Sequence, residues 1–87
     1  MKNVLMMVLR DCPYCHQAFR MMDELKKAHP EYENVTVRVA DEEEEKELAD
    51  SLDYYYVPTY FVDGEKIHEG VPTPEKVRAV YEAALGR

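Results

Sequence analysis

Two cysteines, Cys12 and Cys15, are the residues of this sequence best suited to chemistry, and the chain contains no others. They begin and end the motif Cys-Pro-Tyr-Cys, one helical turn apart, a spacing that lets two thiols close a disulfide or share a metal ion. Pro13 suits the first position of a helix, because its missing N–H costs nothing there and its φ is already helical. Cys12 would then be the N-cap, where unpaired backbone amides and the positive end of the helix dipole favour thiolate over thiol. We therefore predict Cys12 as the nucleophile and Cys15, one turn further into the helix, as the resolving thiol.

The overall composition predicts a small acidic domain. The chain has 87 residues, 46% of them hydrophobic, which suffices for one core and one domain over residues 1–87. A formal charge of −7 argues against nucleic acid and against an anionic membrane surface as partners. The apolar run at residues 4–9 is too short for a signal peptide or a membrane span. We expect a cytoplasmic monomer, a setting in which a close cysteine pair indicates redox or metal chemistry rather than a structural disulfide.

The first half of the chain predicts a strand, a helix and a second strand. The continuous apolar run at 4–9 suits a central strand buried on both faces, ending just before Cys12. Residues 13–28 carry apolar side chains at helical spacing, and the helix should end before Pro30. In residues 35–39, valine alternates with polar residues, which predicts a half-buried strand. It should run parallel to the first strand, since a whole helix separates the two.

The acidic run at residues 41–47 has a structural interpretation. Asp41 can serve as the N-cap of a helix, and Glu44 stands at the capping-box position three residues later. Leu48, Ala49 and Leu52 would supply its short buried stripe. We therefore predict a second helix here, with its acids on a solvated face rather than in a specific site.

The last third predicts a hairpin and a final helix. Residues 59–62 and 66–69 flank Asp63-Gly64, a strong signal for a tight turn between antiparallel strands. Thr73 and Pro74 fit the N-cap and first turn of a closing helix with apolar residues at helical spacing. The predicted order is βαβαββα.

The Cys-Pro-Tyr-Cys motif, the Val57-Pro58 pair about forty residues later and this element order together resemble the thioredoxin-like superfamily, specifically the glutaredoxins, whose dithiol site reads the same. The resemblance implies an α/β fold with a four-stranded mixed sheet flanked by helices. It also implies a thiol–disulfide oxidoreductase, with Pro58 in the cis form and Val57 offering backbone hydrogen bonds to substrate. No tightly bound cofactor is expected, and glutathione is a possible co-substrate.

The resemblance also assigns a substrate groove around Cys12. The residues expected to bind substrate are Arg10, Tyr14, Tyr56, Val57, Pro58 and Gly70. Two of these positions differ from the family pattern, since Tyr56 replaces a threonine and Gly70 is the one glycine left of a Gly-Gly pair. The expected substrates are protein or small-molecule disulfides. The electron donor stays open between glutathione and a thioredoxin-reductase-type protein.

The same residues leave other chemistries open. The run 4–9 contains no acid that could take the proton of Cys15, so this role would fall to water, the leaving thiolate or His16. Residues 12–16 also spell Cys-x-x-Cys-His, the signature of c-type haem attachment. A zinc site would need more than these two thiols. Glutaredoxins can also bridge an iron–sulfur cluster between protomers, usually through a monothiol site, so the dithiol sequence makes this a minor option for the present chain. A redox-sensing or docking module that uses the tyrosines at 54–56 is a non-enzymatic alternative.

Overall fold

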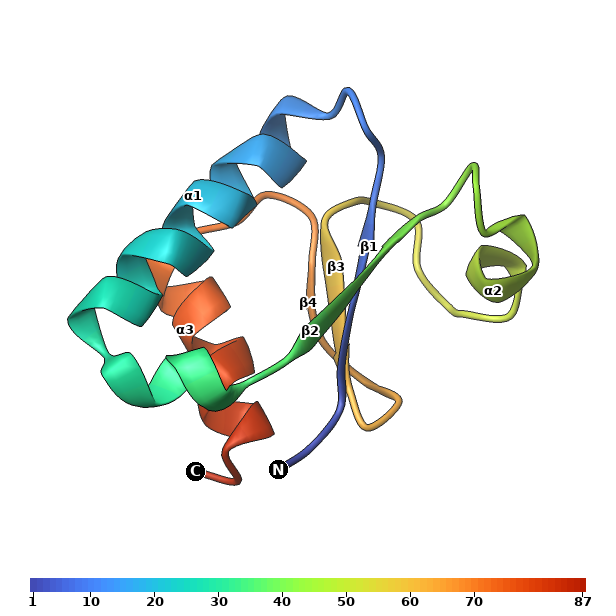
Figure 1. The fold of residues 1–87 in the computed structure, drawn as a ribbon. Coiled ribbons are helices and arrows are strands. Elements are labelled where there is room, and N and C mark those ends of the chain that lie inside the picture. Colours follow the sequence, from blue (N-terminus) through green and yellow to red (C-terminus); the bar gives the residue numbers. More distant parts are fainter.

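The fold is built on a four-stranded mixed sheet, as a computed structural model of all 87 residues shows (Figure 1). The elements along the chain are β1 (Val4–Val8), α1 (Pro13–Ala28), the 3-10 helix η1 (Pro30–Asn34), β2 (Val37–Asp41), α2 (Lys46–Asp50), β3 (Thr59–Val62), β4 (Glu65–Glu69) and α3 (Pro74–Ala84). The strand order is β2-β1-β3-β4, with β1 parallel to β2 and antiparallel to β3. The predicted order βαβαββα is confirmed, with η1 as an unpredicted addition.

Helices cover both faces of the sheet. In Figure 1, α1 and α3 lie together on one side and α2 lies alone on the other. Successive side chains of β1 point to opposite faces of the sheet. Met6 lies in the larger core beneath α1 and α3, whereas Met7 packs with Ala40 and Phe61 beneath α2. Because β1 is central and covered on both sides, its sequence is continuously apolar. No helix has the length and apolar character needed to cross a membrane.

The start of α1 follows from the local sequence as predicted. Cys12 is the N-cap with an extended backbone, and Pro13 occupies the first turn. The helix ends at Ala28, and Pro30 then begins η1. The β1–α1 connection that carries Cys12 lies at the end of the molecule opposite both chain termini (Figure 1).

The hairpin and the last helix are also confirmed. Asp63 and Gly64 have φ angles of 48° and 83°, as a two-residue turn between twisted strands requires. Thr73 caps α3, because its side chain accepts a hydrogen bond of 3.2 Å from the Lys76 amide. The turn joins β3 to β4, and the Thr73 cap ends the β4–α3 connection where α3 begins.

The second strand is shifted from its predicted position. It spans Val37–Asp41 instead of 35–39, and Val35 is buried where η1 ends. Val39 remains 45% exposed, although alternation placed it on the inner face. β2 is an edge strand, and no other element covers it at Val39. The inner residue at this end is Ala40, which faces α2.

The prediction that Asp41 caps the second helix is wrong. α2 contains only Lys46–Asp50, and its N-cap is Glu45. The Asp41 carboxylate instead accepts hydrogen bonds from the amides of Glu43 at 2.8 Å and Arg10 at 2.9 Å. It stabilises a turn before α2 and ties that turn to the segment preceding Cys12. Leu48, Ala49 and Leu52 do pack against the sheet, but each is only partly buried.

Candidate active site

The two cysteines occupy different environments at the start of α1. Cys12 is half-buried and its Sγ lies 3.9 Å from the Val57 carbonyl oxygen, to which the thiol donates a weak hydrogen bond. Cys15 is fully buried in the core beneath α1. Both are free thiols. The outer thiol can therefore meet a substrate, while the inner thiol can react only with a group that is already on Cys12.

Burial controls the ionisation of the inner thiol. Loss of hydration raises the pKa of Cys15 to about 12, an effect that the Leu9 backbone partly offsets and the neighbouring Cys12 reinforces. Cys15 is consequently a neutral thiol at physiological pH. A neutral, buried thiol is a poor nucleophile towards a disulfide in solution.

The segment before β3 forms one wall of the site. The Val57–Pro58 peptide bond is cis, as the resemblance implied. The Gly70 amide donates a hydrogen bond of 2.9 Å to the Pro58 carbonyl, and the Thr59 hydroxyl donates one to the Tyr56 carbonyl. Gly70 has a φ of 94°, a conformation that favours glycine, where the chain turns from β4 towards α3. The Val57 amide forms no hydrogen bond within the chain.

A small apolar depression lies beside Cys12. Four of the residues expected to bind substrate meet there, joined by Val71, which the sequence analysis missed. We call it the aromatic hollow; it is lined by Tyr14, Tyr56, Val57, Gly70 and Val71. Tyr14 is 46% exposed, Tyr56 70% and Val71 53%, so large apolar surfaces stand open to solvent beside the reactive sulfur.

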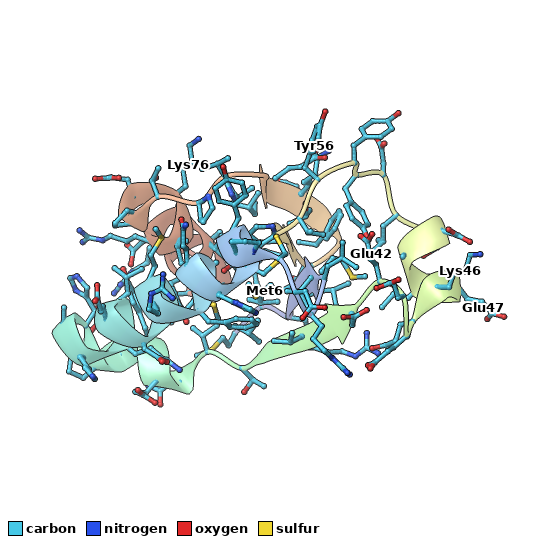
Figure 2. All side chains as sticks on the ribbon, turned by 90° about the horizontal axis from the view of Figure 1, so that it is seen from above. Met6, Glu42, Lys46, Glu47, Tyr56 and Lys76 are labelled. Carbon is cyan, nitrogen blue, oxygen red and sulfur yellow. The ribbon has the colours of Figure 1, made fainter.

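A second depression begins where the first one ends. Its lining includes Glu42, Glu43, Lys46, Asp50, Tyr54 and Tyr55, and we call it the acidic hollow. Segment 54–57 thus contributes its first two residues to the acidic hollow and its last two to the aromatic hollow. In Figure 2, the Tyr56 side chain projects outwards from this segment, while Glu42 lies nearer to α2, which begins at Lys46.

Arg10 and His16 both lie outside the lining of the aromatic hollow. Arg10 does not line the aromatic hollow, because its guanidinium pairs with Glu44 at 2.7 Å on the α2 side. His16 is exposed, and its Nε2 lies 2.8 Å from the Arg10 carbonyl oxygen. That hydrogen bond steadies the loop before Cys12. In the first strand, Met6 is fully buried in the core beneath α1.

Glu69 is a positioning residue that the sequence did not reveal. Its Oε2 accepts hydrogen bonds from the amides of Tyr55 at 2.5 Å and Tyr56 at 2.9 Å. Its Oε1 binds Lys66 Nζ at 2.7 Å, and Lys66 also reaches the Asp53 carbonyl at 3.1 Å. The end of β4 thereby holds the backbone of the segment that carries Tyr56 and Val57.

Glu69→Gln should loosen this segment. The neutral amide forms weaker hydrogen bonds than a carboxylate and loses the pairing with Lys66, so the Tyr55 and Tyr56 amides should exchange with solvent about tenfold faster. Amide hydrogen exchange measures this directly. Glu65→Gln is the control, because Glu65 begins the same strand and should leave the exchange of Tyr55 and Tyr56 unchanged. Equal exchange in the two variants would contradict the role of Glu69.

The same contact predicts a pH dependence. The hydrogen bonds from Lys66 and the two tyrosine amides lower the pKa of Glu69 to about 2, below the value of about 4.3 in an unfolded chain. A lowered pKa stabilises the folded form above the unfolded value and loses that effect as the pH falls through the folded value. Protection of the Tyr55 and Tyr56 amides should therefore decline between about pH 4.5 and pH 2 in the wild type. In Glu69→Gln it should change little over this range.

The fold and the dithiol at the N-terminus of α1 define a thioredoxin-like protein. The family model described as "Thioredoxin domain" matches residues 2–82, so the chain belongs to this thioredoxin family. A search of curated sequences found no matching protein.

Solved structures share the fold. One is a protein disulfide oxidoreductase from Aeropyrum pernix, which is similar to this chain with a TM-score of 0.68 and 24% sequence identity. The match covers 99% of the present chain. The chain spans 38% of that protein. Another is the oxidised thioredoxin from Plasmodium falciparum, with a TM-score of 0.69 and 15% identity, covering 94% of this chain and 79% of that one. These likenesses establish the architecture.

Proposed function

We propose that this chain reduces disulfides by dithiol exchange, with Cys12 as the attacking thiolate and Cys15 as the resolving thiol. The observation that carries the proposal is the contrast between the two sulfurs: Cys12 is reachable at the N-cap, whereas Cys15 is buried with a pKa of about 12. Membership of the thioredoxin family supports dithiol exchange as the chemistry of the Cys-x-x-Cys motif.

The exchange proceeds in two steps that balance. In the first, the Cys12 thiolate attacks one sulfur of R–S–S–R′, forming the mixed disulfide Cys12–S–S–R and releasing R′–S⁻, which takes up a proton. In the second, Cys15 gives its proton to the departing R–S⁻ and attacks Cys12 Sγ, so that RSH leaves and Cys12–Cys15 is oxidised. The substrate gains two electrons and two protons, and an external reductant must return them to the chain.

The charges around the site favour a protein rather than glutathione as the electron donor. Glutathione carries two carboxylates, but no cation lines the aromatic hollow and Arg10 is paired with Glu44. Residues 41–45 are all acidic. We therefore propose a thioredoxin-reductase-type protein as the electron donor, with glutathione as the alternative donor. Like charges at such exposed positions oppose glutathione only weakly, which makes a direct comparison necessary.

The Cys15→Ser variant tests the proposal. Incubated with bis(2-hydroxyethyl) disulfide, a small neutral probe, it should form an adduct on Cys12 that mass spectrometry detects and dithiothreitol removes. The double variant lacking both thiols is the control and should gain no mass. An adduct absent from Cys15→Ser would refute the role of Cys12. Parallel incubation with oxidised glutathione ranks the donors: an adduct that forms as fast as with the neutral probe and that reduced glutathione clears would favour the glutathione-dependent alternative.

A further inference from the structure

We propose that the protein substrates or donors of this chain present their cysteine in an extended segment with an apolar residue next to it and a lysine or arginine within about four residues. The apolar side chain would occupy the aromatic hollow, and the cation would face the acidic hollow. This inference rests on the proposed function and adds to it the chemical nature of the partner.

The apolar requirement follows from where exposed apolar surface collects. Six large hydrophobic side chains of the chain are strongly exposed, and four of them are Tyr14, Tyr55, Tyr56 and Val71. They come from α1, the segment before β3 and the β4–α3 connection, so folding gathers them from three places. Only Met1 and Val39 lie elsewhere. Such a cluster beside a reactive sulfur indicates a surface that a partner covers.

The basic requirement follows from an asymmetry of charge. Residues 38–53 contain eight carboxylates against the two cations Arg38 and Lys46, so this stretch alone carries −6 of the total formal charge of −7. Glu44 and Glu45 are already paired, with Arg10 and Arg38 respectively. The carboxylates that line the acidic hollow have no such pairing: Glu42 accepts only the Tyr54 hydroxyl at 2.9 Å, and Glu43 and Asp50 form no ion pair.

The geometry of segment 54–57 links the two requirements. Consecutive residues of this segment line first one hollow and then the other, and Tyr55 and Tyr56 stand at the boundary. Figure 2 shows Tyr56 projecting outwards from this segment, with Glu42 nearer to α2. An extended partner advances about 3.3 Å per residue, so one short stretch reaches both hollows. A partner without the cation, or with an acid in its place, would leave Glu43 and Asp50 without an ion-pair partner.

Four synthetic peptides test the partner side. Each is a ten-residue extended peptide dimerised through its single cysteine, with either leucine or serine beside the cysteine and either lysine or glutamate three residues away. Both chain directions are prepared, and the faster direction is used. The rate of adduct formation on Cys12 in the Cys15→Ser variant is then measured. The peptides with leucine should react about tenfold faster than those with serine, as expected when the aromatic hollow buries one aliphatic side chain. The peptides with lysine should react about threefold to tenfold faster than those with glutamate at low salt, and this difference should disappear at high salt.

Matched variants of the chain, each made in the Cys15→Ser background, test its own side. Val71→Ser should remove the preference for leucine, whereas Val39→Ser should not, although Val39 is an equally apolar residue at 45% exposure. Glu43→Lys combined with Asp50→Lys should reverse the preference for lysine. The charge-matched control, Glu65→Lys combined with Glu75→Lys, alters exposed acids outside the acidic hollow and should retain that preference.

Failure of this inference is distinguishable from failure of the proposed function. If the neutral probe modifies Cys12 but all four peptides react at one rate, the partner chemistry is overturned and disulfide exchange stands. If the neutral probe leaves Cys12 unmodified, the proposed function itself fails. Equal peptide rates together with self-association that Val71→Ser abolishes would assign the aromatic hollow to a second copy of this chain and overturn the proposal.

Discussion

Cys12→Ser is expected to lower the rate of disulfide reduction by at least about a thousandfold, because the serine hydroxyl is un-ionised at neutral pH and Cys15 cannot replace the lost thiolate. Cys15 is fully buried, and its pKa of about 12 leaves roughly one molecule in 10⁵ as thiolate at pH 7. Steady-state reduction of a peptide disulfide, with dithiothreitol resetting the chain, measures the loss after the uncatalysed rate is subtracted.

The residual activity of Cys12→Ser should also depend on pH. If it arises from Cys15, it should rise about tenfold per pH unit between pH 7 and pH 9, since the thiolate fraction grows in this way below a raised pKa. Cys15→Ser is the matched control. It should still form the adduct on Cys12 in a single turnover, but it should lose the second step, in which Cys15 releases the bound thiol from Cys12. Rapid adduct formation on Cys15 in the Cys12→Ser protein at pH 7 would reverse the two roles.

The sequence alone was sufficient for the elements that local chemistry dictates. Pro13 after Cys12 placed the N-terminus of α1, and the positive φ of Asp63 and Gly64 shows why that dipeptide makes a tight turn. The continuous apolar run of β1 indicated burial on both faces, and the structure confirms a central strand. In each case the deciding interaction lies within a few residues of the signal.

Interactions over long sequence distances could not be predicted in this way. Aspartate is a residue type that commonly serves as an N-cap, yet one carboxylate oxygen of Asp41 accepts a hydrogen bond from the Arg10 amide, 31 residues away. Glu69 lies 14 residues from the Tyr55 amide that it binds, and no local pattern marks such a pair. The resemblance implies a substrate contact for Arg10, whereas in the structure its guanidinium pairs with Glu44, one of the acids at residues 41–45.

The same limit applies to η1, whose Tyr32 was not singled out by any periodic pattern and is fully buried. Its ring stacks on Tyr81 of α3 with a centroid distance of 4.7 Å and an interplanar angle of 8°. Its hydroxyl donates to Glu82 Oε2 at 2.7 Å and accepts from Arg78 Nε at 3.2 Å. Tyr32 thus joins the segment after α1 to the last helix by both packing and hydrogen bonds, on the side of the sheet that also holds Cys15.

Tyr32→Ala should therefore lower the free energy of unfolding by about 3–5 kcal/mol, since it opens a cavity in the larger core and leaves Tyr81 without its stacking partner. For a domain of this size the midpoint of thermal unfolding should fall by roughly 15–30 °C. Tyr32→Phe keeps the ring and should cost only about 1 kcal/mol for the hydroxyl contacts. Tyr55→Ala, at a site 86% exposed, should change stability little. Urea denaturation of the three variants separates these contributions, and a loss in Tyr32→Ala no larger than in Tyr32→Phe would show that the stacked ring does not secure α3 to the core.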